Sequence, residues 1–168
     1  MSRVYLILGG ARSGKSRHAL SICSGMKGPH RFIATAQAYD DEMSDRIRQH
    51  REERGESWHT IEAPIELARA IASVNEGIVL VDCCTLWLSN VMLAELDVSR
   101  ETDALVESIA RAKADVVMVS NEVGSGIVPD NRLGRDFRDE QGRLNQRLAE
   151  ISSSVELVVA GLPLRLKG

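Results

Sequence analysis

The chain has 168 residues and carries 21 lysines and arginines against 24 aspartates and glutamates, a formal net charge of −3. This length suits one domain with a substantial core, so we expect a single domain over residues 1–168. The near balance of charge gives no indication of nucleic-acid binding. No apolar run is long enough for a membrane-spanning helix and no signal-peptide pattern is present, so we expect a cytoplasmic protein without stable membrane insertion.

The chain contains three cysteines, Cys23, Cys83 and Cys84. Their positions do not form a C-x-x-C pair, and reduced thiols are the default in the cytoplasm. We therefore interpret them as small core residues.

Apolar runs of strand length recur along the chain, with helical stretches between them. The expected strands are Val4–Leu8, Arg31–Ala34, Ile78–Val81, Val116–Ser120 and Val155–Ala160, with a weaker candidate at Trp58–Ile61 and an edge strand at Leu164–Leu166. Uninterrupted apolar runs are typical of strands buried on both faces, and their alternation with helices predicts a parallel sheet. The fold class is therefore α/β, with a mostly parallel sheet flanked by helices.

Several helices are expected between these strands. Asp40, Asp41 and Glu42 place negative charge before a helix that runs to about Arg54, and Gly55 ends this helix. Pro64 fits the first position of a helix that continues to Val74. The other expected helices are His18–Ile22, Thr85–Glu95, Ser99–Lys113 and Arg132–Ser152, the last with a break near Gly142. Residues 121–131 contain two glycines and a proline and are expected to form a loop.

The segment Gly9-Gly10-Ala11-Arg12-Ser13-Gly14-Lys15-Ser16 matches G-x-x-x-x-G-K-[ST] at every fixed position. It lies between an apolar run and a helical run, which is the context that a phosphate-binding loop requires. Its glycines let N–H groups point at phosphate oxygens, and the helix N-terminus adds a favourable dipole. Lys15 would reach the β and γ phosphates, and Ser16 would hold Mg²⁺. We therefore predict nucleoside triphosphate binding and a P-loop nucleoside triphosphate hydrolase fold rather than a chance glycine turn.

Polar residues follow the ends of the other expected strands. They are Thr35-Ala36-Gln37, Asp82 and Asn121-Glu122. Because ligands in open α/β sheets bind beyond the carboxyl ends of the strands, we expect these residues to converge on one site with the phosphate loop. Asp82 is a candidate for Mg²⁺, as acids at such strand ends are in P-loop proteins. The alternative is that Asp82 is the N-cap of the following helix.

The expected helix over residues 40–54 carries a histidine among arginines. His50 shares a helix face with Met43 and Ile47 and is flanked by Arg46 and Arg51. Such a histidine is poorly placed for a cation but well placed for a phosphate, because positive neighbours favour neutral imidazole, the nucleophilic form. The alternative is a solvated helix stabilised by Arg–Glu pairs.

The glycine-rich segment after the fourth buried strand has two interpretations. Asn121-Glu122-Val123-Gly124-Ser125-Gly126-Ile127-Val128-Pro129 could approach a ligand with its backbone or act as a moving lid. Its composition is equally typical of a structural turn.

These residues match a known family over nearly the whole chain. The chain resembles the bifunctional adenosylcobinamide kinase/adenosylcobinamide-phosphate guanylyltransferases of cobalamin biosynthesis. The matching segments are residues 9–16, Ile-Ala-Thr-Ala at 33–36, Asp-Asp-Glu-Met at 40–43, His50-Arg51 with Arg54, Trp58 with Thr60 and Glu62, Val81-Asp82-Cys83 with Thr85 and Trp87, residues 121–129, Phe-Arg-Asp at 137–139, and Asn145-Gln146. Many families share the phosphate loop, whereas the His-Arg and Asn-Glu-Val-Gly segments together are far more specific.

The resemblance implies two reactions. A kinase step transfers the γ-phosphate of ATP or GTP to the hydroxyl of adenosylcobinamide. A guanylyl step then transfers GMP from GTP to that phosphate through a GMP–histidine intermediate, for which His50 is the matching position, and gives adenosylcobinamide-GDP. The resemblance also implies Mg²⁺ with GTP or ATP as substrates, no prosthetic group, and a homotrimer with sites near subunit boundaries.

The same resemblance implies residue roles. Lys15 and His50 are the catalytic candidates, and Ser16 with Asp82 would hold the metal. Nucleotide contacts are expected at Gly9, Gly10, Ala11, Arg12, Ser13, Gly14, Lys15, Ser16, Ala34, Thr35, Ala36, Arg51, Glu52, Glu53, Arg54, Glu62 and Asp82. Glu62 or Asp82 could accept hydrogen bonds from guanine, a role that competes with metal binding at Asp82.

Two other functions would use the same phosphate loop. A single-function small-molecule kinase would not need His50 and would form no covalent nucleotide adduct. A nucleotide-dependent switch ATPase or GTPase would instead reshape a surface that binds a partner. The chain has no Asn-Lys-x-Asp guanine signature of the regulatory GTPases, so guanine selectivity is implied by the resemblance alone.

Overall fold

The computed structural model of the chain describes residues 2–37, 41, 44–45, 47–48, 52, 55 and 57–168. Its strands are β1 (Val4–Gly9), β2 (His30–Ala34), β3 (Trp58–Glu62), β4 (Ile78–Asp82), β5 (Asp115–Asn121), β6 (Ser154–Val159) and β7 (Leu162–Lys167). Its helices are α1 (Lys15–Ser24), α3 (Leu67–Ala72), α4 (Cys84–Leu93), α5 (Val98–Ala110) and α6 (Arg132–Ile151). The expected strands are all present, most of them extended by one or two residues.

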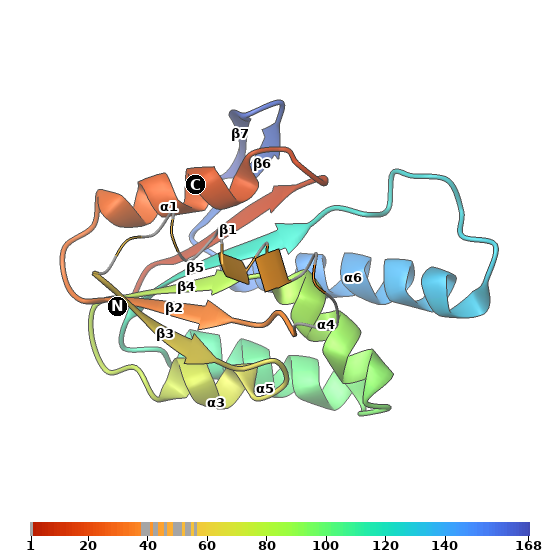
Figure 1. The fold of residues 1–168 in the computed structure, drawn as a ribbon, viewed down its shortest axis with the longest axis horizontal. Coiled ribbons are helices and arrows are strands. Elements are labelled where there is room, and N and C mark those ends of the chain that lie inside the picture. The colour runs from red at the N-terminus through yellow and green to blue at the C-terminus, as the bar shows by residue number, and fades with distance from the viewer. Residues whose placement is uncertain are drawn as a thin grey trace.

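The strands form one sheet in the order β3-β2-β4-β5-β1-β6-β7. Every neighbouring pair is parallel except β6 and β7, which form an antiparallel hairpin at the edge of the sheet. The α/β fold with a mostly parallel sheet is therefore confirmed, as is the edge strand at the carboxyl terminus. Because β1 lies between β5 and β6, the carboxyl end of β1 is flanked by strands on both sides (Figure 1).

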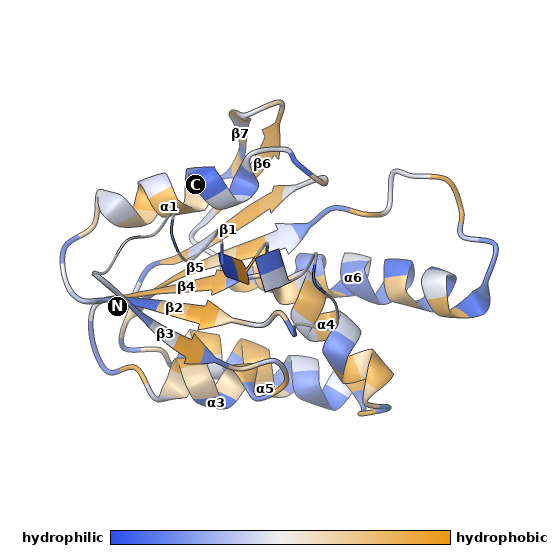
Figure 2. Ribbon diagram, viewed as in Figure 1, coloured by the Kyte–Doolittle hydropathy of each residue, from blue (hydrophilic) through white to orange (hydrophobic). Residues whose placement is uncertain are grey.

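Helices cover both faces of the sheet unequally. Among the described elements, α1 packs on one face against β1, β4, β5 and β6, while α3, α4, α5 and α6 pack together on the other face (Figure 1). Two apolar clusters fill the interfaces, with Ile7, Ala19 and Val119 under α1 and with Leu88, Leu105 and Leu148 on the opposite face. Figure 2 shows mostly apolar central strands and, around them, helices in which apolar and polar residues are mixed.

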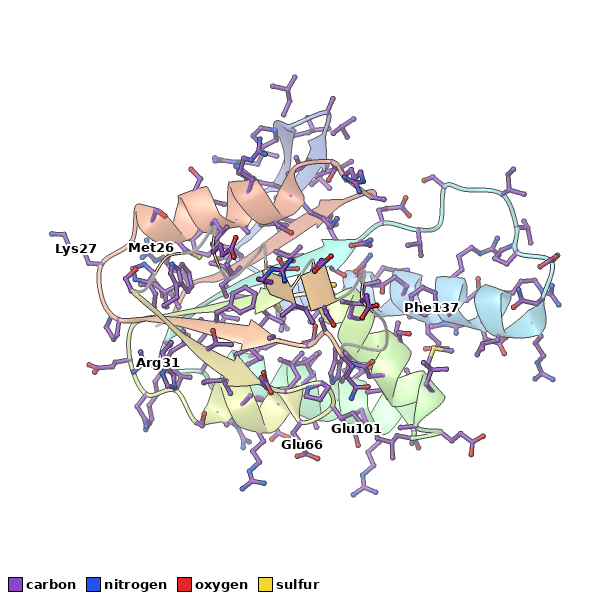
Figure 3. All side chains as sticks on the ribbon, in the orientation of Figure 1. Met26, Lys27, Arg31, Glu66, Glu101 and Phe137 are labelled. Atoms are coloured by element: carbon purple, nitrogen blue, oxygen red, sulfur yellow. The ribbon has the colours of Figure 1, made fainter. Side chains whose placement is uncertain are left out.

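The side chains labelled in Figure 3 mark the two ends of the strands. Met26 and Lys27 follow α1 and lie near the amino ends, while Phe137 on α6 lies beyond the carboxyl ends (Figure 3). The phosphate loop follows β1 and the loop over residues 122–131 follows β5, so both loops lie at the carboxyl ends of the strands.

The prediction that Pro64 begins a helix is wrong, because α3 begins at Leu67. The carbonyls of Pro64 and Ile65 accept hydrogen bonds from α4 instead. Asn90 Nδ2 donates to the Pro64 carbonyl at 2.9 Å, and Trp87 Nε1 donates to the Ile65 carbonyl at 2.8 Å. Those tertiary bonds hold the segment before Leu67 in a non-helical conformation.

Two helix predictions need smaller corrections. The expected break near Gly142 is absent, since α6 runs unbroken from Arg132 to Ile151. Gly142 lies on the exposed side of α6, where nothing lies within 4 Å of a Cβ built on it, and the helix continues through it. The helix expected to reach Lys113 ends at Ala110.

The cysteines are core residues, as expected. Cys23, Cys83 and Cys84 are free and buried. Burial raises the pKa of the Cys23 thiol to about 12, and it also raises the pKa of Cys84. All three thiols are therefore protonated at neutral pH.

None of the helices in the described part of the chain combines the length and the apolar character needed to cross a bilayer.

Candidate active site

The phosphate loop joins the end of β1 to the start of α1. Lys15 Nζ donates a hydrogen bond to the Gly10 carbonyl at 3.0 Å, and the Ser13 N–H donates to the same carbonyl at 3.3 Å. The ammonium group of Lys15 therefore lies across the mouth of the loop rather than out in solvent. This arrangement concentrates positive charge where the loop's N–H groups can receive phosphate oxygens.

Two positions in the loop require glycine. A Cβ on Gly9 would collide with Ser13 Oγ and would lie 2.8 Å from the Val158 carbonyl oxygen. Gly14 has a φ of 94° and faces the Gly161 Cα, which a Cβ on Gly14 would approach to 3.2 Å. The β6–β7 turn therefore packs directly against the loop, and the Gly161 N–H donates to the Ser13 carbonyl at 2.8 Å.

The loop carries the features of an anion site. The first turn of α1 has no acidic residue, and no side chain caps its N-terminus. Ser13 Oγ is buried and has no hydrogen-bond partner among the described residues. A buried hydroxyl without a partner costs free energy, and a phosphate oxygen would satisfy it. The loop therefore fits the triphosphate that its sequence predicts.

The sheet register brings the other predicted residues to the same edge. Ala34 lies between Glu62 and Asp82 in neighbouring strands, while Gly9 lies between Asn121 and Val158. The four strand ends expected to converge therefore do so. Glu62 is exposed and Asp82 is half-buried, so both carboxylates are accessible from the carboxyl edge.

Asp82 is not the N-cap of the helix that follows it. Cys83 is the N-cap of α4, and its Sγ accepts a hydrogen bond from the Leu86 N–H at 3.4 Å. Burial and, to a smaller extent, the negative charge of Asp82 raise the pKa of Cys83 to about 12, while the positive charge of Lys15 opposes them. Both charged groups therefore act on the same thiol at the β4–α4 junction.

Thr35 is fully buried, and its hydroxyl is engaged by the protein itself. Thr35 Oγ1 donates to the Cys83 carbonyl at 2.7 Å and accepts from the Cys83 N–H at 2.9 Å. Asn90 Nδ2 donates to the Thr35 carbonyl at 2.8 Å. A nucleotide contact by the Thr35 hydroxyl would require it to leave Cys83, so this side chain supports the site by holding the residue after Asp82.

The predicted histidine helix is only partly described. Asp41, Ser44, Asp45, Ile47, Arg48 and Glu52 are helical, whereas His50, Arg51, Glu53 and Arg54 lie outside the described residues. Glu52 is exposed. Of the remaining predicted contacts, Ala11 and Arg12 are exposed and Ala36 is half-buried.

The loop expected over residues 121–131 is present over 122–131, whereas Asn121 is the last residue of β5. The carboxylate of Glu122 accepts hydrogen bonds from the Gly124 N–H at 2.7 Å and from Ser125 Oγ at 2.9 Å, which folds the start of the loop onto itself. Farther along, Ile127 is 97% exposed. The loop therefore combines an ordered base beside the site with an apolar exposed tip.

The sequence analysis assigns no role to a largely buried polar cluster behind the end of β5. It consists of Thr85, Ser120, Gln141 and Asn145. Single polar residues in a helix or a strand carry little periodic signal, so only the presence of Thr85 and Asn145 in the segments that match the family points toward them.

The donor set for a metal is small. Within the described residues, no group of three His, Cys, Asp or Glu side chains could hold a metal ion. Ser16 in the first turn of α1 and Asp82 at the end of β4 supply one hydroxyl and one carboxylate. This set fits Mg²⁺, which keeps several waters and takes phosphate oxygens with one or two protein ligands.

Comparisons with known proteins agree with the resemblance. The family model described as "Cobinamide kinase / cobinamide phosphate guanyltransferase" matches residues 5–166. The bifunctional adenosylcobalamin biosynthesis protein CobP of Pseudomonas aeruginosa is 46% identical over 97% of this chain and 96% of its own length. The bifunctional adenosylcobalamin biosynthesis protein CobU of Escherichia coli is 41% identical over 98% of this chain and 99% of its own.

A solved structure supports the fold. The chain aligns with an ATPase from the type III secretion system of pathogenic bacteria with a TM-score of 0.60 and 13% identity, over 97% of this chain and 56% of that one. At this identity the likeness concerns the fold alone. It confirms the predicted P-loop nucleoside triphosphate hydrolase fold.

Proposed function

The chain belongs to the cobinamide kinase / cobinamide phosphate guanyltransferase family, and we propose that its phosphate loop, Asp82 and His50 divide that family's two reactions between them. The chain is an enzyme that phosphorylates cobinamide and then transfers a guanylyl group to the cobinamide phosphate. The observation that carries the residue assignment is the placement of the phosphate loop and Asp82 at the carboxyl ends of β1 and β4, which lie on either side of β5. The physiological acceptor in the proposal is adenosylcobinamide.

In the kinase step, the acceptor hydroxyl oxygen attacks the γ-phosphorus of ATP or GTP. The bond from the γ-phosphorus to the bridging oxygen breaks, the nucleoside diphosphate leaves, and the hydroxyl proton passes to solvent. Lys15 and the N–H groups of residues 9–16 stabilise the negative charge that develops on the phosphate oxygens. The orphaned Ser13 hydroxyl supports this assignment, since it lies within the same loop.

In the guanylyl step, an imidazole nitrogen of His50 attacks the α-phosphorus of GTP. The bond between the α-phosphorus and its bridging oxygen breaks, and pyrophosphate leaves. A phosphate oxygen of cobinamide phosphate then attacks the same phosphorus and releases His50. Arg51 and Arg54 lie one and four residues farther along the chain, where guanidinium groups suit phosphate oxygens.

Other residues complete the nucleotide site in this proposal. Ser16 and Asp82 hold Mg²⁺, which when bound neutralises charge on the triphosphate. Glu62, exposed at the end of β3, accepts hydrogen bonds from guanine, and that assignment leaves Asp82 to the metal. No prosthetic group takes part.

The covalent intermediate gives the decisive test. We would incubate the protein with Mg²⁺ and GTP labelled at the α-phosphate, denature it, and treat samples with acid or base. A label that is acid-labile, base-stable and located on His50 is expected, because the P–N bond of a phosphoramidate hydrolyses in acid. A protein without label that still phosphorylates cobinamide would be a kinase only and would overturn the histidine assignment.

Replacement of His50 separates the two reactions. His50→Ala should abolish guanylyl transfer, by about 10⁴-fold or more for loss of a nucleophile, and spare most of the kinase rate. His59→Ala removes an exposed histidine of β3 and is the matched control. Equal loss of both activities in folded His50→Ala protein would contradict separate roles.

The proposed assembly is a homotrimer that acts in the cytoplasm. Leu162, Leu164 and Leu166 lie on one side of the edge strand β7 and, with Val159, are more than half exposed, which supports burial against another subunit. The three free thiols suit a reducing compartment. The protein should be recovered in the soluble fraction of cells. Analytical sedimentation of that protein should give a mass three times that of the chain. A monomer would overturn the assembly.

A further inference from the structure

We propose that Thr85 and Asn145 are positioning residues that clamp the peptide groups of Asn121 and thereby set the spacing between the phosphate loop and Asp82. The inference deepens the proposed function, on which it rests. It concerns neither a new ligand nor a contact with substrate. It assigns a role to buried side chains that lie behind the nucleotide site.

The clamp replaces a missing strand neighbour. The last partner of β4 on β5 is Val119, opposite Asp82, so Asn121 extends beyond the end of β4. The Asn121 N–H donates to Thr85 Oγ1 at 2.7 Å, and the Asn121 carbonyl accepts from Asn145 Nδ2 at 3.0 Å. Buried backbone groups without a partner are costly. Two side chains from α4 and α6 therefore supply the bonds that β4 no longer offers.

The clamp is itself held by a buried network. Ser120 Oγ donates to Asn145 Oδ1 at 2.7 Å, and Gln141 Nε2 donates to Ser120 Oγ at 3.0 Å and to Asn145 Oδ1 at 2.9 Å. Ser120 and Gln141 are fully buried, and Thr85 is 8% exposed. The bond between Gln141 and Ser120 is buried and the two bonds to the half-buried Asn145 are partly buried, and together they hold the amide of Asn145 in one orientation.

One side of the clamp leads to the phosphate loop. Gly9 lies opposite Asn121 in the sheet, and the next N–H, that of Glu122, donates to the Gly9 carbonyl at 3.0 Å. The position of the Asn121 peptide therefore determines where the loop leaves the sheet. A displacement of Asn121 would move Gly9 and Gly10, whose carbonyl receives Lys15.

The other side of the clamp leads to Asp82. Thr85 lies in the first turn of α4, three residues after Asp82, and Cys83 between them is held by Thr35. Thr85 thus joins the Asp82 end of β4 to the Asn121 end of β5. Because the loop binds phosphates and Asp82 faces the metal in the proposed mechanism, the clamp controls the geometry of a nucleotide–metal complex that both must contact.

The test uses substitutions that change single hydrogen bonds. Thr85→Val keeps the shape of the side chain but removes the acceptor for the Asn121 N–H, whereas Thr85→Ser keeps the hydroxyl. Asn145→Asp keeps the acceptor oxygen but removes the donor to the Asn121 carbonyl. Asn75→Asp makes the same chemical change at an exposed position, where Lys113 donates to Oδ1, an atom that the substitution retains.

The first readout is the affinity for GTP measured by calorimetry with Mg²⁺ and with EDTA. We expect Thr85→Val and Asn145→Asp to lose most of the affinity gained from Mg²⁺, while the affinity in EDTA changes less than about threefold. The second readout is turnover with Mg²⁺, for which we expect kcat to fall about 10- to 100-fold, as misplacement of reacting groups does, and KM for GTP to rise in step with the lost Mg²⁺-linked affinity. Thr85→Ser and Asn75→Asp should behave like the wild type.

Two results would overturn the inference. One is a folded Thr85→Val or Asn145→Asp protein with wild-type Mg²⁺-linked affinity. The other is a Thr85→Ser protein as impaired as Thr85→Val. If Thr85→Val does not fold, Asn145→Asp decides. The binding readout needs no cobinamide, so a wild type that binds Mg²⁺–GTP but transfers nothing would count against the proposed function and leave the clamp to be judged by affinity.

Discussion

The ends of β1 and β5 lie side by side in the sheet but are held in place by different means. At the end of β1, main-chain contacts dominate, with Gly9 beneath the Val158 carbonyl and Gly14 against Gly161. At the end of β5, side chains from α4 and α6 hold the Asn121 peptide. The first region is therefore sensitive to added volume, and the second is sensitive to lost hydrogen bonds.

This difference follows from what each region must do. The phosphate loop has to present N–H groups to a ligand, so its own backbone must stay close to neighbouring backbone and free of side chains. The end of β5 reaches the loop through its pairing with Gly9 and through the Glu122 N–H, which donates to the Gly9 carbonyl. The Asn121 peptide itself is fixed by side chains of α4 and α6.

The largest effect is expected from added volume at the end of β1. Gly9→Ala should destabilise the protein by about 1–3 kcal/mol, because the new methyl group meets a backbone carbonyl that cannot rotate away. It should also weaken GTP binding more than tenfold, since the loop must shift. Urea unfolding and GTP titration would measure the two effects.

Gly10→Ala is the matched control for stability, since nothing lies within 4 Å of a Cβ built on Gly10. Its free energy of unfolding should stay within about 0.5 kcal/mol of the wild type. The double variant Gly9→Ala with Ser13→Ala should recover only part of the loss, because Val158 still lies 2.8 Å from the new Cβ. Equal stability of the Gly9→Ala and Gly10→Ala proteins would contradict a loop held by close backbone packing.

The two regions also differ in how far the sequence predicts them. Each fixed residue of the phosphate loop meets a local requirement of the backbone, and buried strands appear as uninterrupted apolar runs. Both could therefore be predicted directly from the sequence. The convergence of Thr35, Asp82, Asn121 and the loop followed from a general property of parallel sheets. These local and topological rules predict the strands and the end of the sheet at which the site lies, whereas the strand order comes from the structure.

The clamp could not be predicted because its partners are far apart in the chain. Thr85 and Asn121 are 36 residues apart, and Asn145 lies 24 residues beyond Asn121. The same limit explains the error at Pro64, whose carbonyl is bound by Asn90, 26 residues away. Local propensity favoured a helix start there, and long-range hydrogen bonds outweighed it.

A smaller, pH-dependent effect is expected at the start of α4, the helix that supplies Thr85 to the end of β5, because its N-cap is the titratable thiol of Cys83. Burial raises the pKa of Cys83 from 9.0 to about 12, so the folded state favours the protonated thiol. The resulting stability is complete below pH 9 and is lost as the pH rises toward 12. Each such thiol should lower the free energy of unfolding by at most about 1.4 kcal/mol per pH unit in that window.

Urea unfolding of the wild type at pH 8, 9 and 10 would measure this slope. Cys83→Ala should flatten it, because the thiol that must stay protonated is gone, and Cys23→Ala should flatten it by a similar amount, since burial raises that pKa to about 12 as well. An unchanged slope in Cys83→Ala would mean that the β4–α4 junction tolerates a thiolate, and the cap would then contribute little to the side-chain-held end of the site.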